Sequence, residues 1–123
     1  MLLKDFYKII SLSQVGEQNY CAHIRLNSGH AIFKGHFPDN PVTPGVCMMQ
    51  IVKELTEQIL GINLQLLRSS NVKFMALINP EINADLKLDL EISTTEESVY
   101  KVKNITYMQD TVALKLVNNY TIK

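Results

Sequence analysis

The residues best suited to chemistry lie in residues 35–45, which read GHFPDNPVTPG and run directly into an apolar stretch. Three of the four prolines of the chain occur here, spaced three residues apart. Each proline fixes its own φ, lacks an N–H donor and moves the preceding residue out of the helical region. We therefore predict a stiff, extended lead-in to a helix, with His36 at its start. The unperturbed pKa of a histidine is about 6.5, which suits a base that acts near neutral pH.

The predicted helix start offers a second chemical feature. Gly45 and Val46 are expected to be its first residues, and the N–H groups of a first helical turn have no acceptor within the helix. These donors, together with the positive end of the helix dipole, suit a carbonyl oxygen that gains negative charge during a reaction. A simpler role for Gly45, to permit a tight turn, is compatible with the same geometry.

The pattern His-Phe-Pro-x-x-Pro-x-x-Pro-Gly resembles the active-site loop of the β-hydroxyacyl-acyl-carrier-protein dehydratases of the FabZ and FabA type. Its fixed positions are met by His36, Phe37, Pro38, Pro41, Pro44 and Gly45. A weaker similarity continues through Lys73-Phe74, Pro80 and Leu86. The resemblance implies a hotdog fold and the elimination of water from a 3-hydroxyacyl thioester, which gives a trans-2-enoyl thioester. It also implies catalysis without a metal or another cofactor.

The same resemblance implies roles for individual residues. His36 would take the proton beside the thioester carbonyl, and the Gly45 N–H would bind the carbonyl oxygen as it becomes enolate-like. We expect the substrate to contact four further residues of the loop and helix, namely Phe37, Pro44, Val46 and Met49. For Met49 and its neighbours Cys47 and Met48, packing in the core is an equally good interpretation.

Position 50 departs from the family pattern. The family places a catalytic carboxylate on the central helix fourteen residues after the histidine, and this chain has Gln50 there. An amide holds a water or a hydroxyl by hydrogen bonds, but it does not protonate a leaving hydroxide. The proton would then come from Glu54, from Asp39, or from water or a partner subunit. The simpler interpretations, which we favour, are that Glu54 and Glu57 lie on a solvated helix face and that Asp39 stabilises a turn.

Hydrophobic periodicity predicts the elements that position these residues. Residues 46–60 contain no glycine or proline, carry an apolar stripe at the helical period and are followed by Gly61, which favours a helix end. Strands are expected at 20–26 and 30–33, within 64–75, and at 84–94, 99–109 and 111–122, and residues 2–10 form a strand or a short helix. His23 and His30, which belong to no motif, are predicted to lie on strand faces.

One helix among long strands indicates an α+β layer arrangement. The resemblance narrows this class to a hotdog fold, in which a long antiparallel sheet wraps around one central helix, here about 46–60. With 123 residues and no linker or repeat, the chain is predicted to be a single domain, residues 1–123.

Composition excludes several classes of function. Twelve basic residues balance twelve acidic ones, so nothing predicts a nucleic acid or a membrane surface as partner. Cys21 and Cys47 form no metal-ligand spacing, and we expect no metal site. The N-terminal residues lack the apolar core of a signal peptide, and no apolar stretch is long enough to span a bilayer. We therefore expect a cytoplasmic protein.

The expected ligand is an acyl thioester of acyl carrier protein or of CoA. Lys34, Arg68 and Lys73 are candidates to meet the carrier, although scattered surface charges explain them equally well. The resemblance also predicts a homodimer or a multiple of one. Two alternatives to the dehydratase stay open. One is a hotdog thioesterase, and the other is a catalytically weak acyl-binding subunit that pairs with an active homologue.

Overall fold

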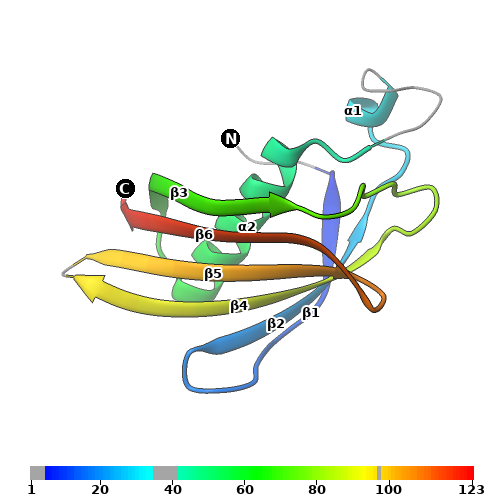
Figure 1. Cartoon of the computed structure of the whole chain (residues 1–123). Coiled ribbons are helices and arrows are strands. Elements are labelled where there is room, and N and C mark those ends of the chain that lie inside the picture. Colours follow the sequence, from blue (N-terminus) through cyan, green and yellow to red (C-terminus); the bar gives the residue numbers. More distant parts are fainter. Residues whose placement is uncertain (1–4, 35–41, 97) are drawn as a thin grey trace.

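The computed structural model describes residues 5–34, 42–96 and 98–123 of the chain. Six strands form one antiparallel sheet in the order β1-β2-β4-β5-β6-β3, and the long helix α2 lies along one face of it (Figure 1). The elements are β1 Tyr7–Gln14, β2 Asn19–Leu26, α1 Ala31–Lys34, α2 Gly45–Leu60, β3 Leu64–Phe74, β4 Asp85–Glu96, β5 Val99–Met108 and β6 Thr111–Ile122. This is the predicted arrangement of a long antiparallel sheet wrapped around one helix.

The sheet buries one face against α2, as strand β4 illustrates. Its side chains alternate, because successive residues of a strand point to opposite faces. Leu86, Leu88, Leu90 and Ile92 are buried, whereas Lys87 and Glu91 are exposed on the outer face. The alternation of apolar and polar residues that predicted the strand therefore also determines which face of the sheet packs against the helix.

Helix α2 begins and ends where the local sequence predicts. Pro44 precedes it with extended backbone, φ −60° and ψ 141°, and Gly61 ends it in the left-handed conformation with φ 71°. The Gly61 N–H donates to the Glu57 carbonyl at 2.8 Å, which satisfies one of the last carbonyls of the helix. The apolar stripe is buried against the sheet: Cys47, Met48, Ile51, Val52 and Leu55. No helix in the described ranges is long and apolar enough to cross a membrane.

The prediction of a strand at residues 30–33 is wrong, because residues 31–34 form the short helix α1. His30 begins this helix: its Nδ1 accepts the Ile32 N–H at 3.1 Å, and its carbonyl accepts the Phe33 N–H at 3.1 Å. The buried Phe33 stacks on Phe6 at 5.2 Å between ring centroids. The Nδ1 acceptor of His30 at the helix start and the stacking of Phe33 on Phe6 therefore favour a helix here, although the apolar residues had predicted a strand. His30 does not lie on a strand face, whereas His23 lies exposed on β2 as predicted.

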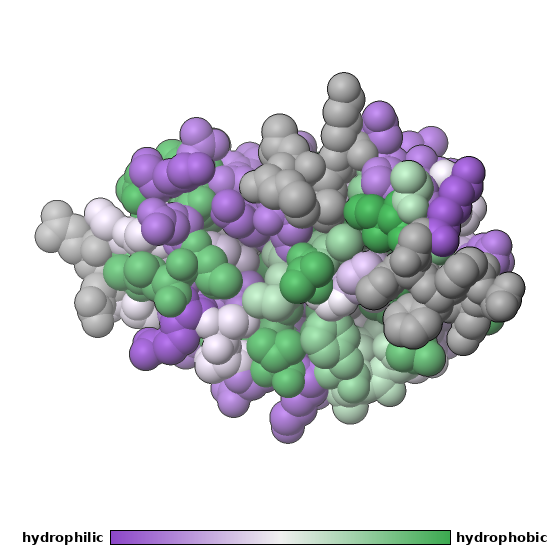
Figure 2. Space-filling view, turned by 90° about the horizontal axis from the view of Figure 1, so that it is seen from above, coloured by the Kyte–Doolittle hydropathy of each residue, from purple (hydrophilic) through white to green (hydrophobic). Residues whose placement is uncertain are grey.

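Strand β3 lies at one edge of the sheet and is irregular. Its pairing with β6 shifts register twice, and Asn71 adopts a positive φ of 52° at the second shift. Several large apolar side chains on β3 and just after it are exposed: Leu66, Leu67, Val72, Phe74, Met75 and Leu77. Figure 2 shows the face that lies uppermost in Figure 1, where apolar side chains gather among polar ones.

Candidate functional site

Within the described part of the chain, the first turn of α2 presents two backbone N–H groups without an acceptor, which are called the free amides below. The Pro44 carbonyl accepts the first intrahelical hydrogen bonds, from the N–H of Cys47 at 3.0 Å and of Met48 at 3.3 Å. The N–H groups of Gly45 and Val46 precede these bonds and have no acceptor within the helix. The positive end of the helix dipole lies at the same point. This turn therefore suits an oxygen atom that carries or develops negative charge.

A groove of about 260 Å³ opens beside this turn. It lies between residues 42–45 and residues 74–78 and is lined by Val42, Thr43, Pro44, Gly45, Phe74, Ala76, Leu77 and Ile78. Its wall is almost entirely apolar. The exception is Thr43, which is 6% exposed and whose hydroxyl has no hydrogen-bond partner in the described part of the chain. A buried hydroxyl without a partner is costly, because no hydrogen bond compensates its desolvation.

Gly45 allows the groove wall to approach the helix closely. A Cβ built on Gly45 would lie 2.7 Å from Cζ of Phe74, closer than real Cβ contacts. Gly61 is the glycine with a positive φ among those that the structure describes, so Gly45 has a backbone that any residue adopts. The glycine therefore serves the approach of the Phe74 ring, and not the tight turn that the sequence also allowed.

Gln50 lies one helical turn beyond Val46 and is held by a carboxylate. Its Nε2 donates to Oε2 of Glu54 at 2.9 Å, and the Tyr7 hydroxyl donates to Oε1 of the same carboxylate at 2.9 Å. The three side chains are half-buried where the start of β1 meets α2. Burial, and secondarily the nearby Glu54 carboxylate, raise the pKa of Tyr7 well above its ordinary value, so that Tyr7 stays a donor at neutral pH.

The preferred interpretation of Glu54 and Glu57 as a solvated helix face is wrong. Glu54 accepts from Tyr7 and Gln50, and Glu57 accepts the N–H of Leu64 at 2.8 Å, at the start of β3. The two carboxylates therefore tie α2 to both edge strands of the sheet. The periodicity of the helix alone did not reveal this role, because their partners lie on other elements. Tyr7 was not a sequence-based candidate, and no motif marks it.

The other sequence-based candidates fall into separate groups. His36 and Phe37 lie outside the described residues, as does Asp39. Pro44 and Gly45 line the groove, and Val46, 73% exposed, lies on the solvent side of the same turn. Cys47 and Met48 are buried in the core, and Met49 is half-buried against it. Core packing is therefore the right interpretation of Cys47 and Met48.

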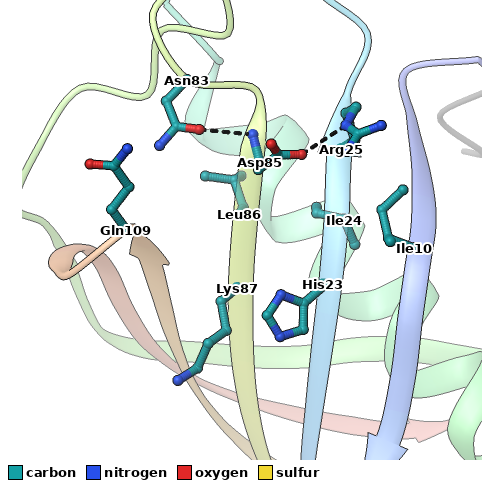
Figure 3. Close-up of a pocket in the computed structure, with 9 residues that line it drawn as sticks. All are labelled: Ile10, His23, Ile24, Arg25, Asn83, Asp85, Leu86, Lys87 and Gln109. Atoms are coloured by element: carbon teal, nitrogen blue, oxygen red, sulfur yellow. Dashed lines mark hydrogen bonds and ion pairs between the residues drawn. The ribbon is translucent and has the colours of Figure 1, made fainter.

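A second hollow, of about 440 Å³, lies on the outer face of the sheet, away from α2 (Figure 3). His23, Arg25 and Lys87 project into it beside Asp85, and Arg25 Nε donates to Oδ1 of Asp85 at 2.8 Å. Both side chains of this ion pair are more than half exposed, so water screens it. No sequence-predicted site residue lines this hollow, and we place the candidate site at the groove instead.

No metal-binding arrangement occurs in residues 5–34, 42–96 and 98–123. No three His, Cys, Asp or Glu side chains there lie together as ligands would. The polar groups at the described groove are therefore the backbone N–H groups at the start of α2 and the buried Thr43 hydroxyl.

The fold and the site define a hotdog-fold protein, with an antiparallel sheet wrapped around a helix whose free amides open beside an apolar groove. Residues 12–113 match the ApeI-like family, described as ApeI dehydratase. The chain belongs to this family of dehydratases.

Curated relatives of the chain carry the name of a dehydratase. The chain is 28% identical to the 3-hydroxyacyl-[acyl-carrier-protein] dehydratase FabZ of Lactobacillus helveticus, over 91% of this chain and 82% of that protein. It is 25% identical to the enzyme of the same name from Caulobacter sp. (strain K31), over 66% of this chain and 54% of that protein. The chain thus spans about half the length of the Caulobacter relatives that it matches.

Solved structures share the fold. The dehydratase heterocomplex ApeI:P from Xenorhabdus doucetiae contains a chain with a TM-score of 0.73 and 19% identity, over 93% of this chain and 96% of that chain. A hypothetical thioesterase with coenzyme A from Streptococcus pneumoniae has a TM-score of 0.66 and 11% identity, over 95% and 85%. At these identities the likeness concerns the fold alone.

Proposed function

We propose that this protein is a dehydratase of 3-hydroxyacyl thioesters carried by acyl carrier protein, and that it forms the trans-2-enoyl thioester in the synthesis of a fatty acid or a related lipid. The observation that carries the proposal is the first turn of α2. Its two free amides lie beside an apolar groove and directly follow the segment that bears His36. Membership of the dehydratase family supports the same reaction.

In the proposed reaction, His36 removes the proton from the carbon next to the thioester carbonyl. The carbonyl oxygen gains negative charge and is stabilised by the N–H groups of Gly45 and Val46. The electron pair of the enolate then forms the double bond between the second and third carbons, and the 3-hydroxyl leaves as water. Phe37, Pro44 and Met49 are proposed to contact the acyl thioester, whose apolar part the groove would accommodate.

The leaving hydroxyl needs a proton, and Gln50 does not supply it. We assign Gln50 the role of orienting the 3-hydroxyl, with the proton coming from water, from a partner subunit or from the imidazolium that His36 becomes. General acid catalysis typically contributes about 10² to 10⁴ in rate, so we expect turnover slower than that of relatives with a carboxylic acid at this position.

The decisive experiment compares two substrates on the purified protein. A 3-hydroxyacyl thioester of acyl carrier protein and the corresponding saturated acyl thioester are incubated separately, and mass spectrometry follows loss of water and loss of the acyl group. We expect loss of water from the first substrate and no hydrolysis of either. Hydrolysis of both without dehydration would replace the proposal with a thioesterase. A parallel pair of CoA thioesters decides the carrier.

A thioesterase is the second candidate, and Gln50 is the observation that favours it. In hydrolysis of a thioester no hydroxyl leaves, so an amide that only holds a water molecule is sufficient. The fold is compatible with this reaction, because the hypothetical thioesterase of Streptococcus pneumoniae shares it.

A catalytically weak subunit paired with an active homologue is the third candidate. The same missing acid at position 50 favours it, and the related Xenorhabdus protein belongs to a dehydratase heterocomplex. Binding of acylated carrier protein with no turnover of any thioester would support this role. Recovery of turnover on addition of a second hotdog subunit would establish it.

A further inference from the structure

The Glu54 carboxylate determines which end of the Gln50 amide is available to a ligand. An ionised carboxylate accepts hydrogen bonds and donates none. Since Gln50 lies 2.9 Å from Oε2 of Glu54, its NH₂ group must turn toward that oxygen. The amide oxygen, Oε1, is thereby turned away from Glu54. Gln50 then offers its free side as a hydrogen-bond acceptor.

The Glu54 carboxylate is itself fixed in place. The hydroxyl of Tyr7 donates to its other oxygen at 2.9 Å, from an element 47 residues away along the chain. A carboxylate held at both oxygens has little freedom to rotate, so it imposes one orientation on the amide. Burial and the carboxylate both favour the protonated form of Tyr7, which keeps this donor in place at neutral pH.

Gln50 lies within reach of the first turn of α2. Residues four apart lie on the same face of a helix, so Gln50 shares a face with Val46, about 6 Å away along the axis. Side chains of a helix also lean toward its N-terminus. The acceptor oxygen of Gln50 therefore lies on the same helix face as Val46, one turn from the free amides of Gly45 and Val46.

We propose that Glu54, anchored by Tyr7, is a positioning residue that holds Gln50 Oε1 as an acceptor for the 3-hydroxyl of the substrate. The proposal rests on the function proposed above and assigns the residue that recognises the hydroxyl. A site built to bond a hydroxyl discriminates against the analogue that lacks it, because its own polar group is then left unpaired. Glu54 thus acts through Gln50 and contributes selectivity for 3-hydroxyacyl over saturated acyl chains.

The test measures binding as well as turnover. The probes are 3-hydroxyoctanoyl-pantetheine and octanoyl-pantetheine in which an amide replaces the thioester, so that neither reacts. We expect the parent protein to bind the hydroxylated probe about two- to tenfold more tightly, the range of one net hydrogen bond. Glu54→Gln should remove this preference, because an amide at position 54 bonds either end of Gln50. Tyr7→Phe should reduce it in part.

Glu57→Gln is the matched control, since it removes a carboxylate one turn away that bonds Leu64 and not Gln50. It should leave the preference unchanged, and Gln50→Leu should abolish it. In the Gln50→Leu background, Glu54→Gln should have no further effect on the binding of either probe. A merely structural role of Glu54 would not predict this result. Circular dichroism and thermal melting check each fold, and Tyr7→Phe carries the test if Glu54→Gln does not fold.

The outcomes separate this inference from the proposed function. Selective binding that Glu54→Gln abolishes, without dehydration by the parent, retains the inference and refutes the function. Dehydration by the parent with an unchanged binding preference in Glu54→Gln, or no preference in the parent at all, overturns the inference. The inference would also be overturned if Glu54→Gln kept the binding preference but removed the limb of the pH profile of kcat/KM that reports the general acid. Glu54 would then be the proton donor.

Discussion

The ring of Phe74 lies directly against the backbone of Gly45, where β3 ends and α2 begins, with no space for a Cβ between them. This contact joins the groove wall to the free amides of the helix. It also explains why position 45 suits a glycine although its φ is not positive.

Gly45→Ala should impair activity more than stability. The added methyl group forces the Phe74 ring to move, and because that ring is 53% exposed it has room to do so. We expect a change in Tm of a few degrees at most, and a fall in kcat/KM of about tenfold to a hundredfold, because displacement near reacting atoms is costly. Gly29→Ala is the control, since its Cβ meets no atom closer than 3.4 Å. Equal losses in both variants would contradict the prediction.

Thr43→Val should stabilise the protein or leave its stability unchanged. The hydroxyl is buried without a partner in the described structure, so its replacement by a methyl group removes a desolvation penalty of about 1 kcal/mol. Urea denaturation measures the free energy of unfolding. Thr56→Val should instead destabilise the protein, since that buried hydroxyl donates to the Val52 carbonyl at 2.8 Å. Destabilisation by Thr43→Val would show that its hydroxyl has a structural partner.

His36→Ala should lower the rate of turnover by a factor of about 10² to 10⁴ and leave the melting temperature nearly unchanged. The base must be neutral to accept a proton, so kcat/KM of the parent should fall as pH decreases through about 6.5. The variant should lose that limb of the pH profile. His23→Ala, at an exposed position on β2, serves as the control. A His36→Ala variant that remains active on every thioester would refute the assignment of the base.

Gln50→Glu should raise dehydration of a 3-hydroxyacyl thioester by about tenfold or more, which corresponds to about 1.4 kcal/mol of barrier. The new carboxylate lies beside the Glu54 carboxylate, and like charges four residues apart on a helix repel each other. The variant should therefore be less stable than the parent at neutral pH.

The same substitution at Gln65, exposed on β3, is the control for Gln50→Glu. A fall in dehydration would indicate that Gln50 is already matched to its own reaction. An unchanged rate would mean that position 50 does not face the substrate.

We predict a homodimer joined edge to edge through β3. This edge strand exposes a row of apolar side chains, and two sheets that pair there would cover them. Light scattering at micromolar concentration should give twice the mass of one chain. Leu67→Lys on β3 should shift the protein toward monomer, whereas Ile10→Lys on the opposite edge strand should not. A folded parent monomer would refute the prediction.

Local sequence was sufficient to predict most elements. The helical period and Gly61 predicted α2 to within one residue at its start, and the alternation around Leu86–Ile92 predicted β4 and its buried face. These features depend on neighbours within one or two turns or along one strand. Sequence also indicated which residues to examine for chemistry, because three prolines and a histidine constrain the backbone locally.

Only the tertiary structure decided how position 50 is held. Tyr7 and Glu54 are far apart in sequence, and their bond exists because the sheet, as it wraps around the helix, brings the start of β1 to α2. The same wrapping brings Phe74 against Gly45 and Leu64 to Glu57. Helical periodicity assigns a residue to a face but does not say which strand covers that face. That is why Glu54 was predicted to be solvated, when it instead accepts hydrogen bonds from Tyr7 and Gln50.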